Sequence, residues 1–374
     1  MLTLYVHIPF CRQRCSYCDF YLVTKRDHID AFFRALALET AARSEELKGR
    51  TISAIHFGGG TPSMVPVHYI AEWLEQVASL CSFNPDIEIA LEANPEDLGG
   101  NALEALRSAG ITRLSIGTQS FTSEKLRALG RPHTASDSRE VTAAALRTFP
   151  SVSVDLICGV PTESLSLWQE DLDRALELKP HHLSVYMLSL EPKTQLSRMV
   201  RSGALRVPDD GVQAELYEGA LEAIQLRGYL HYEVSNFALP GHHSRYNLAS
   251  WERKPYLGFG PSAHSFLVSP EREIRTANVS SLARYLADPQ RAEGFREELS
   301  GEERFTEEVF LSLRINRGVD VEFLRKGNKL GHRLSAAISR FSERGWIYEE
   351  GGALYLTGKG FLFADLIAGD LIFG

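Results

Sequence analysis

The stretch that decides the fold is Cys11-Arg12-Gln13-Arg14-Cys15-Ser16-Tyr17-Cys18. Its three cysteines follow directly after an apolar run over residues 2–10, which predicts a loop that wraps a metal centre at the end of a strand. A structural zinc site takes four protein ligands, whereas a four-iron, four-sulfur cluster held by three thiolates leaves one iron open to another molecule. The alternative, three inert buried cysteines, is disfavoured because two arginines lie among them and stabilise thiolates.

Composition limits the class of protein. A chain of 374 residues has room for one large and one small domain. The net charge of −8, without a block of five basic residues, argues against a nucleic-acid partner. No run reaches the roughly 18 apolar residues of a membrane span, and Pro9 cuts short an N-terminal run that lacks the basic start of a secretory signal. We therefore expect a cytoplasmic protein, in which Cys81 and Cys158 are buried thiols rather than a disulfide.

Short apolar runs alternate with amphipathic patterns along the first 230 residues. Strands are predicted at residues 2–9, 53–57, 87–92, 114–118, 152–157 and 183–188. Helices are predicted at residues 28–47, 69–80, 101–109, 137–148, 165–178 and 212–227. Strands that are apolar along their length form a parallel sheet covered by helices. Six such units predict an α/β fold with a partial (β/α)6 barrel; the alternative is a doubly wound open sheet.

Polar and glycine-rich motifs follow the predicted strands at their carboxyl ends. They are the cysteines, Gly58-Gly59-Gly60-Thr61-Pro62, Glu92-Ala93-Asn94-Pro95-Glu96, Gln119-Ser120-Phe121, and Asp155 with Gly159-Val160-Pro161. Each motif is weak by itself, since a glycine triplet is usually a tight turn. The active sites of such barrels lie at the carboxyl ends of the strands. The shared position therefore predicts one common site.

The cysteine loop resembles that of the radical S-adenosylmethionine (SAM) enzymes, in its spacing and in the aromatic residue before the last cysteine. The resemblance implies that Cys11, Cys15 and Cys18 hold a [4Fe-4S] cluster whose open iron binds SAM. The glycine triplet then allows close approach of the backbone to the methionine moiety, and the acidic Glu92 suits the ribose hydroxyls. The cofactor performs the difficult chemistry, and the protein positions and shields it.

Further motifs resemble the oxygen-independent coproporphyrinogen III oxidase family over most of the chain. They are Tyr5-Val6-His7-Ile8-Pro9-Phe10-Cys11, Gly58-Gly59-Gly60-Thr61-Pro62, Gln119-Ser120-Phe121, Asp155-Leu156-Ile157 and Tyr232-Glu233-Val234-Ser235-Asn236-Phe237. By this resemblance the SAM contacts fall on Tyr5, Tyr17, Gly59, Gly60, Thr61, Glu92, Gln119, Arg131, Asp155 and Ser189.

Two departures point to one branch of that family. The true dehydrogenases carry an N-terminal extension and have x-Cys after the third cluster cysteine, whereas here Asp19-Phe20 follows Cys18 and only ten residues precede Cys11. Both features resemble the HemW-type haem chaperones. This implies a protein, monomeric or homodimeric, that binds haem and passes it to respiratory acceptor proteins. The alternative is a radical SAM oxidoreductase of porphyrin biosynthesis that acts on a porphyrinogen.

The haem segment of that branch, His-Asn-x-x-Tyr-Trp, is altered in this chain. The matching stretch runs from Tyr246 to Trp251, with Asn247 and Trp251 kept but the histidine and tyrosine positions changed. A tyrosine phenolate can ligate haem iron, so Tyr246 is one candidate for the axial ligand. His243, or another nearby histidine such as His242 or His264, is a second. The third reading is that this segment supplies no specific axial ligand.

The last part of the chain is predicted to form a unit of its own. Helices at residues 306–316, 320–326 and 333–344 precede a hairpin over 346–357, as in a winged helix. Abundant glutamates argue against affinity for phosphates, so a lid or docking surface over the barrel mouth is expected. Residues 361–373 are predicted as a packed terminal helix, with peripheral membrane or partner contact as the alternative. The predicted domains are a radical SAM barrel (1–235), a connecting segment with the haem region (236–295) and a winged-helix-like domain (296–374).

Overall fold

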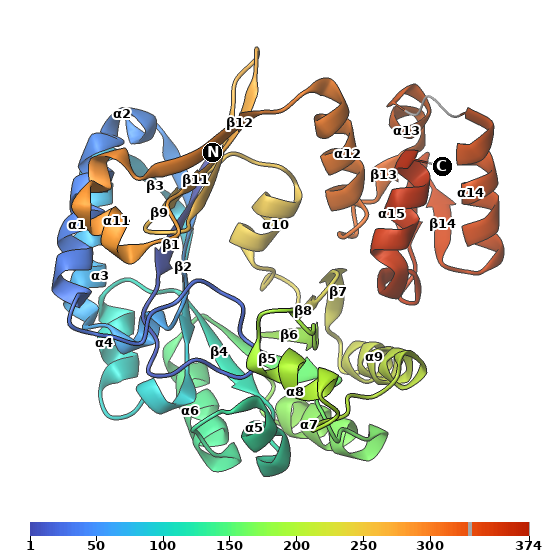
Figure 1. Ribbon diagram of the computed structural model, residues 1–374, viewed down its shortest axis with the longest axis horizontal. Helices are drawn as coiled ribbons and strands as arrows, with labels where there is room; N and C mark the ends of the chain where they lie inside the picture. The colour runs from blue at the N-terminus through green and yellow to red at the C-terminus, as the bar shows by residue number, and fades with distance from the viewer. Residues whose placement is uncertain (328–330, 374) are drawn as a thin grey trace.

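The computed structural model describes residues 1–327 and 331–373 (Figure 1). The strands are β1 (Leu2–Ile8), β2 (Thr51–Gly59), β3 (Ser82–Ala93), β4 (Arg113–Gln119), β5 (Ser151–Cys158), β6 (His182–Met187), β7 (Leu230–Glu233), β8 (Asn236–Ala238), β9 (Tyr256–Phe259), β10 (His264–Val268), β11 (Glu273–Asn278), β12 (Glu293–Glu298), β13 (Val319–Asp320), β14 (Ile347–Glu350) and β15 (Ala353–Leu356). The helices are α1 (Ile29–Ala42), α2 (Ser44–Leu47), α3 (Val67–Leu80), α4 (Ala102–Ser108), α5 (Ser123–Leu129), α6 (Ala135–Thr148), α7 (Leu165–Glu177), α8 (Gln195–Arg201), α9 (Asp210–Gln225), α10 (Arg245–Trp251), α11 (Leu282–Ala287), α12 (Gly301–Ser312), α13 (Val321–Gly327), α14 (Gly331–Glu343) and α15 (Ala364–Phe373). Short 3-10 helices are η1 (Pro62–Met64), η2 (Pro95–Asp97), η3 (Pro289–Arg291) and η4 (Gly360–Phe363).

Twelve strands form one curved sheet in the order β12-β11-β10-β9-β1-β2-β3-β4-β5-β6-β8-β7. Strands β1 to β6 are parallel and lie side by side in chain order, which confirms the partial barrel and excludes the doubly wound alternative. The sheet is larger than predicted. Strand β9 pairs in parallel with β1, and antiparallel strands extend both edges. Figure 1 shows the sheet curving around an interior space, with the helices of the first units on its outer side.

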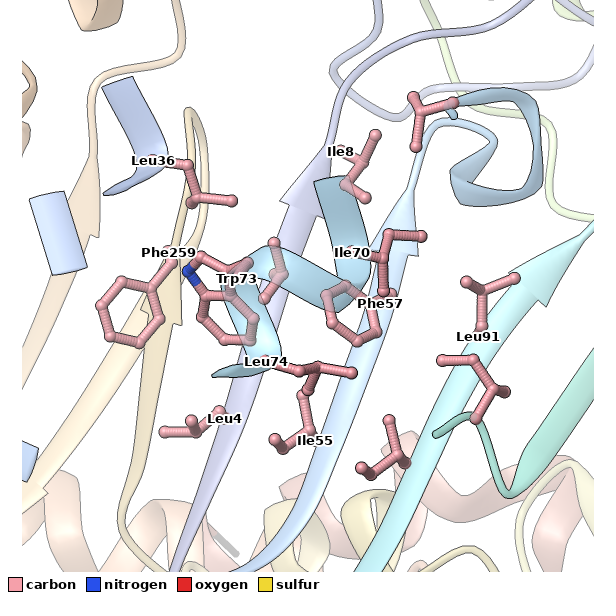
Figure 2. Close-up of a cluster of buried hydrophobic side chains, with 14 of the residues drawn as sticks. Leu4, Ile8, Leu36, Ile55, Phe57, Ile70, Trp73, Leu74, Leu91 and Phe259 are labelled. Carbon is pink, nitrogen blue, oxygen red and sulfur yellow. The ribbon is translucent and has the colours of Figure 1, made fainter. Parts of the chain in front are cut away.

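The outer face of the sheet carries the main hydrophobic core. In β1, Leu4, Val6 and Ile8 are fully buried on this side. They pack with residues of the neighbouring strands and with α1 and α3, as Figure 2 shows for Leu36 and Trp73. Burial of a large aliphatic or aromatic side chain contributes roughly 1.5–3 kcal/mol. This layer therefore fixes the curvature that brings the strand ends together.

The inner face of the sheet is polar, contrary to the expectation of strands that are apolar on both sides. Residues of β1 alternate in period 2, so Thr3, Tyr5 and His7 face inward between the buried aliphatic residues of the outer face. Glu92 and Asp155 occupy equivalent inward positions on β3 and β5. Inward polar side chains make the barrel interior suited to a polar ligand.

Several shorter elements differ from the sequence prediction. The helix predicted over 28–47 is two helices, α1 and α2, and β3 begins five residues earlier than predicted. Helices α5, α8 and α10 and strands β7 to β12 were not predicted at all. These elements have three to seven residues, too few for periodicity to identify them.

The C-terminal unit contains a small sheet in the order β13-β15-β14, with α12 to α15 around it. The predicted hairpin is confirmed: β14 and β15 pair across Gly351 and Gly352, whose φ angles are +58° and +82°. The unit packs on α9 and β8 through a shared apolar cluster. The large interior cavity is lined by residues 11 to 191, so the C-terminal unit does not close it as a lid. Its role as a docking surface stays a prediction.

Two other expectations agree with the structure. Cys81 and Cys158 are free thiols, Cys158 being buried and Cys81 partly buried. In the described parts of the chain, no helix combines the length and the apolar character needed to cross a membrane. The terminal helix begins at residue 364, and its Ile367 and Leu371 are completely buried.

Candidate functional site

The three cysteines lie in a loop that runs from the end of β1 across the mouth of the barrel. Hydrogen bonds from Cys11 N to Val23 O (3.0 Å) and from Val23 N to Pro9 O (2.7 Å) close the base of this loop. Cys11 is buried, and Cys15 and Cys18 are partly exposed. The loop is thus held at its base and keeps two thiols accessible.

Two polar side chains, those of Thr61 and Arg131, donate hydrogen bonds to these sulfurs. Thr61 Oγ1 donates to Cys11 Sγ (3.3 Å), and Arg131 Nη1 donates to Cys15 Sγ (3.4 Å). Burial, with smaller contributions from the neighbouring Cys18 and Cys15, raises the pKa of Cys11 to about 11. Burial also raises the pKa of Cys18. Bound metal deprotonates a coordinating thiol, so these thiols would ionise on binding a metal.

A cavity of about 660 Å³ opens beside the cysteines. Of the ten residues predicted to contact SAM, nine line it: Tyr17, Gly59, Gly60, Thr61, Glu92, Gln119, Arg131, Asp155 and Ser189. All three cysteines line it as well. The structure therefore brings the predicted cluster ligands and nearly all predicted SAM contacts to one space, as expected for loops at the carboxyl ends of parallel strands.

The donor set suits a cluster better than a single ion. Among residues 1–327 and 331–373, no three His, Cys, Asp or Glu side chains converge in a way that would hold one metal ion. In a four-iron cluster each thiolate binds a different iron, so the three sulfurs need not converge on one point. Three thiols on one wall of a polar cavity fit such a cluster.

The glycine triplet fits tightly around its neighbours. A Cβ on Gly58 would lie 2.8 Å from Glu92 Oε1, and one on Gly59 would lie 2.5 Å from the ring of His7. Gly59 also has φ of +103°, which non-glycine residues rarely adopt. A Cβ on Gly60 would lie 2.6 Å from the carbonyl oxygen of Phe10. Glycine thus lets the end of β2 approach His7 and Glu92, and at Gly60 it lets the chain pack against the start of the cysteine loop.

The acidic groups of the cavity are held by hydrogen bonds. Glu92 Oε1 pairs with His56 Nε2 (2.9 Å). Asp155 accepts from Ser115 Oγ (2.8 Å) and Ser153 Oγ (3.0 Å), and burial raises the pKa of this aspartate. These acceptors are oriented before any ligand is present, which limits the cost of binding.

Arg131 links the cysteine loop to the third and fourth strand ends. Its Nη2 donates to Asn94 Oδ1 (2.6 Å) and Gly117 O (2.9 Å). Gln119, at the end of β4, has φ of +64°, a conformation rare for non-glycine residues. The side chain of Ser189 donates to Glu191 (2.6 Å). Asn94 belongs to a motif that the sequence analysis quoted, but its role next to Arg131 was missed because it depends on tertiary contact.

Tyr5 is the one predicted SAM contact that does not line the cavity. Its ring lies against those of both His56 (centroids 6.0 Å apart) and Tyr246 (5.9 Å), and its hydroxyl hydrogen-bonds His7 Nδ1 (3.2 Å). Its assignment to SAM stays a prediction.

Helix α10 carries the altered haem segment and lies against β1 and β2 on the inner side of the sheet (Figure 1). Tyr246 stacks on His56 with centroids 4.9 Å apart, and burial raises the pKa of this phenol. Asn247 N is capped by Ser244 Oγ (3.3 Å), and the ring of Trp251 lies under the Arg314 guanidinium (6.0 Å). The segment is therefore anchored at both ends.

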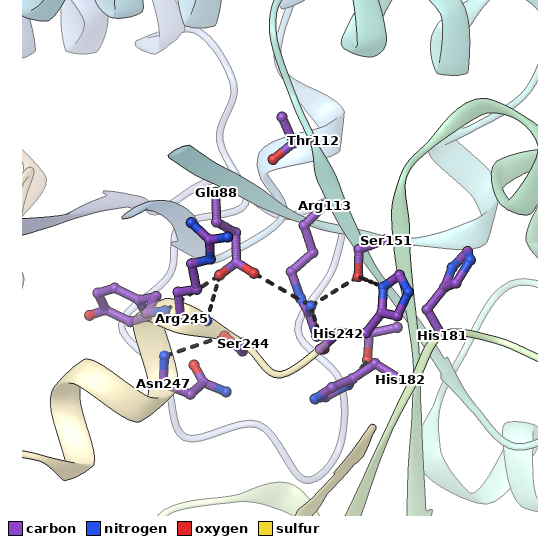
Figure 3. A network of polar contacts seen from close by, with 12 residues as sticks. Glu88, Thr112, Arg113, Ser151, His181, His182, His242, Ser244, Arg245 and Asn247 are labelled. Atoms are coloured by element: carbon purple, nitrogen blue, oxygen red, sulfur yellow. Dashed lines mark hydrogen bonds and ion pairs between the residues drawn. The ribbon is translucent and has the colours of Figure 1, made fainter. Parts of the chain in front are cut away.

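A polar network ties the residues before α10 to the amino-terminal ends of the barrel strands (Figure 3). Arg113 Nη1 donates to Ser151 Oγ (3.0 Å) and to the carbonyl oxygen of His242 (3.0 Å). Glu88 accepts from the backbone of Arg245 (2.9 Å). The cysteines follow the carboxyl end of β1, so the haem segment approaches the barrel from the opposite end.

The four histidines of this region differ in their contacts. His181 stacks on His242 (4.5 Å), and His182 bonds Tyr232 through Nε2 (2.8 Å). His243 Nε2 is buried without a hydrogen-bond partner, and its ring lies against Tyr232 (4.5 Å). Burial and the nearby Arg113 lower the pKa of His243. This imidazole is therefore neutral near pH 7 and keeps a free nitrogen.

Glu233 gives this region a pH dependence. Burial raises its pKa to about 7, although bonds from Ser235 and Trp251 favour the carboxylate. A carboxyl whose folded pKa is raised contributes stability that is complete below pH 4.5 and is lost as pH rises through about 7. We expect wild type to lose about 2–3 kcal/mol more than Glu233→Gln between pH 5 and pH 8, as measured by urea unfolding. Parallel pH profiles for the two proteins would contradict this assignment.

Comparison with known proteins agrees with this geometry. Residues 5–175 match the radical SAM superfamily, and residues 299–363 match the HemN C-terminal domain. The chain is 33% identical to heme chaperone HemW of Bacillus subtilis, over 100% of this chain and 99% of the relative. It is 34% identical to heme chaperone HemW of Lactococcus lactis, over 96% and 94% of the two chains.

A solved structure supports the fold. Coproporphyrinogen III oxidase (HemN) of Escherichia coli, a radical SAM enzyme, superposes with a TM-score of 0.85, covering 100% of this chain and 90% of that one. Its sequence identity is 24%, so this likeness concerns the architecture alone. It confirms the barrel with its C-terminal unit.

Proposed function

The chain belongs to the HemW family of radical SAM proteins, and from this premise we propose that it binds haem and transfers it to acceptor proteins. The observation that carries the proposal is the similarity, over nearly the whole chain, to several heme chaperones. The family implies a [4Fe-4S] cluster and SAM. We propose that haem is the cargo, respiratory proteins the acceptors and the cytoplasm the place of action.

We assign the cluster to Cys11, Cys15 and Cys18 and SAM to the adjacent cavity. When bound, such a cluster supplies an open iron that SAM chelates and an electron for reductive cleavage of SAM. Arg131 would compensate the charge of the thiolates, since it already donates to Cys15. Glu92 and Asp155 are oriented acceptors for hydroxyl groups.

For the axial ligand of haem we propose His243. Its Nε2 lacks a hydrogen-bond partner, and its imidazole is neutral, the form that binds iron. Tyr246 is a poorer candidate because its ring is held in the stack with His56 and its phenol stays protonated. Asn247 and Trp251 would flank the haem.

Haem titration of the cluster-reconstituted protein tests the proposal. We expect a Soret shift that saturates at one haem per chain in wild type and in Tyr246→Phe. His243→Ala should lose the shift, and His242→Ala serves as the matched control. Haem binding that is unchanged in His243→Ala would contradict the ligand assignment. Vinyl formation from coproporphyrinogen, without haem binding, would replace the chaperone by the oxidoreductase.

A further inference from the structure

Three charged side chains meet in the interior behind the fourth and fifth strand ends. They are Lys125 of α5, Glu163 of the loop after β5, and Asp171 of α7, and all three side chains are completely buried. Lys125 Nζ donates to Asp171 Oδ2 (2.6 Å) and also to Glu163. Buried ion pairs seldom stabilise a protein more than apolar residues of similar size. A role other than stability is therefore worth seeking for this ionic hub.

Asp171 holds the loop after β4. It accepts from Ser120 Oγ (2.8 Å), Phe121 N (2.6 Å) and Thr122 Oγ1 (3.1 Å). That loop begins directly after Gln119, which lines the cavity with φ of +64°. A non-glycine residue persists in this conformation only where its surroundings fix the backbone. The bonds to Asp171 supply that fixation.

Glu163 holds the loop after β5. It accepts from Gly159 N (2.5 Å) and Val160 N (3.1 Å). Val160 is fully buried in a small apolar cluster with Ile157, against which Tyr17 of the cysteine loop packs. Ile157 and Tyr17 both line the cavity. A displacement of Glu163 would thus shift Val160 and, through it, the cavity-lining residues Ile157 and Tyr17.

Lys125 belongs to α5, whose C-terminal end accepts hydrogen bonds from the cysteine loop. Ser16 N and Oγ donate to the carbonyl oxygens of Leu129 (3.4 Å) and Ala128 (3.2 Å), at the end of α5. Gln13 Nε2 donates to Gly130 O (2.8 Å), just beyond that helix. One helix therefore connects the cysteine loop to the ionic hub.

We propose that Lys125, Glu163 and Asp171 are positioning residues that fix the loops after β4 and β5 relative to the cysteine loop. They would thereby keep the residues assigned to SAM at the correct distance from the residues assigned to the cluster. The inference rests on the proposed binding of both cofactors. None of the three residues lines the cavity assigned to SAM; they act through Gln119, Val160 and the end of α5. Misplacement of a binding group by about 1 Å can cost two orders of magnitude in function, whereas the fold tolerates it.

The decisive variant is the neutral triple Lys125→Met, Glu163→Gln, Asp171→Asn. It keeps side-chain volume and leaves no unpaired buried charge, so it avoids the penalty of a single substitution. The matched control is Lys48→Met, which removes an exposed lysine. Iron content, thermal unfolding, SAM dissociation constant and the change of the cluster's electron paramagnetic resonance signal on SAM addition are measured anaerobically.

We expect the triple variant to keep its iron and its fold but to bind SAM at least roughly tenfold more weakly, with a loss of the spectral response. Lys48→Met should match wild type. SAM binding by the triple variant within twofold of wild type would overturn the inference. If the triple variant does not fold, Asp171→Asn alone decides, and an unchanged dissociation constant refutes the hub. Failure of wild type itself to bind SAM would instead refute the proposed function.

Discussion

Cys15→Ala is expected to abolish the brown absorbance of the reconstituted protein and to remove most of its iron. Three thiolates bind three of the four irons and leave one iron open. With only two thiolates, two of the four irons would lack a protein ligand. Cys15 also receives the Arg131 hydrogen bond (3.4 Å), so its loss leaves that guanidinium without a sulfur partner. Absorbance and iron per chain are measured after anaerobic reconstitution.

Cys81→Ala provides the control. Its thiol donates to the carbonyl oxygen of Val77 (3.2 Å) at the end of α3 and does not line the cavity. The variant should keep both colour and iron. Equal losses in both variants, or zinc in place of iron in wild type, would overturn the ligand assignment.

Gly60→Ala is expected to lower both stability and iron content. The added methyl would lie 2.6 Å from the carbonyl oxygen of Phe10 and 2.8 Å from that of Ile8, and backbone atoms cannot move aside as a side chain can. Hydrogen bonds join the same segments, from Gly60 N to Ile8 O (2.8 Å) and from Thr61 N to Phe10 O (2.7 Å). Overpacking of this kind costs about 3 kcal/mol. Chemical unfolding and iron analysis measure the two effects.

Gly99→Ala is the matched control for this substitution. No atom lies within 4 Å of a Cβ there, and its φ is outside the left-handed range. Both changes reduce the entropy of the unfolded chain equally, so the difference between them isolates the steric effect. Equal stability and iron content in the two variants would show that the loop after β2 can move away from β1.

The sequence predicted the cofactor side of the molecule well because its signals are local. The spacing of the cysteines and the glycine triplet are short patterns with specific chemical demands, and both lie where parallel strands end. The polar inner face of β1 was missed because Tyr5 and His7 were read as part of one apolar run, although the family resemblance named Tyr5 as a SAM contact. Lys125 escaped for a different reason: a lysine on an amphipathic helix is normally solvated, and only tertiary contact reveals its two carboxylate partners.

The haem segment was the hardest part to read. The resemblance to the haem segment of the family identified Tyr246 and His243 as candidates, but nothing in the local pattern indicated which imidazole lacks a hydrogen-bond partner or which ring is stacked. That depends on the tertiary contacts with His56 and Tyr232, of which His56 lies far away in the chain. Helix α10 has only seven residues and buries none of them completely, so it left little periodicity to detect.

The pairing of β1 with β9 determines when, during synthesis, β1 can be flanked by strands on both sides. Thr3 pairs with Tyr256, so β1 gains its second neighbour only after about 250 further residues have been made, which takes tens of seconds at roughly 5–20 residues per second. During this interval the cysteine loop follows a strand that lacks one of its two neighbours. Iron delivery to the loop is therefore expected to follow the pairing of β9 with β1 rather than to accompany the synthesis of β1.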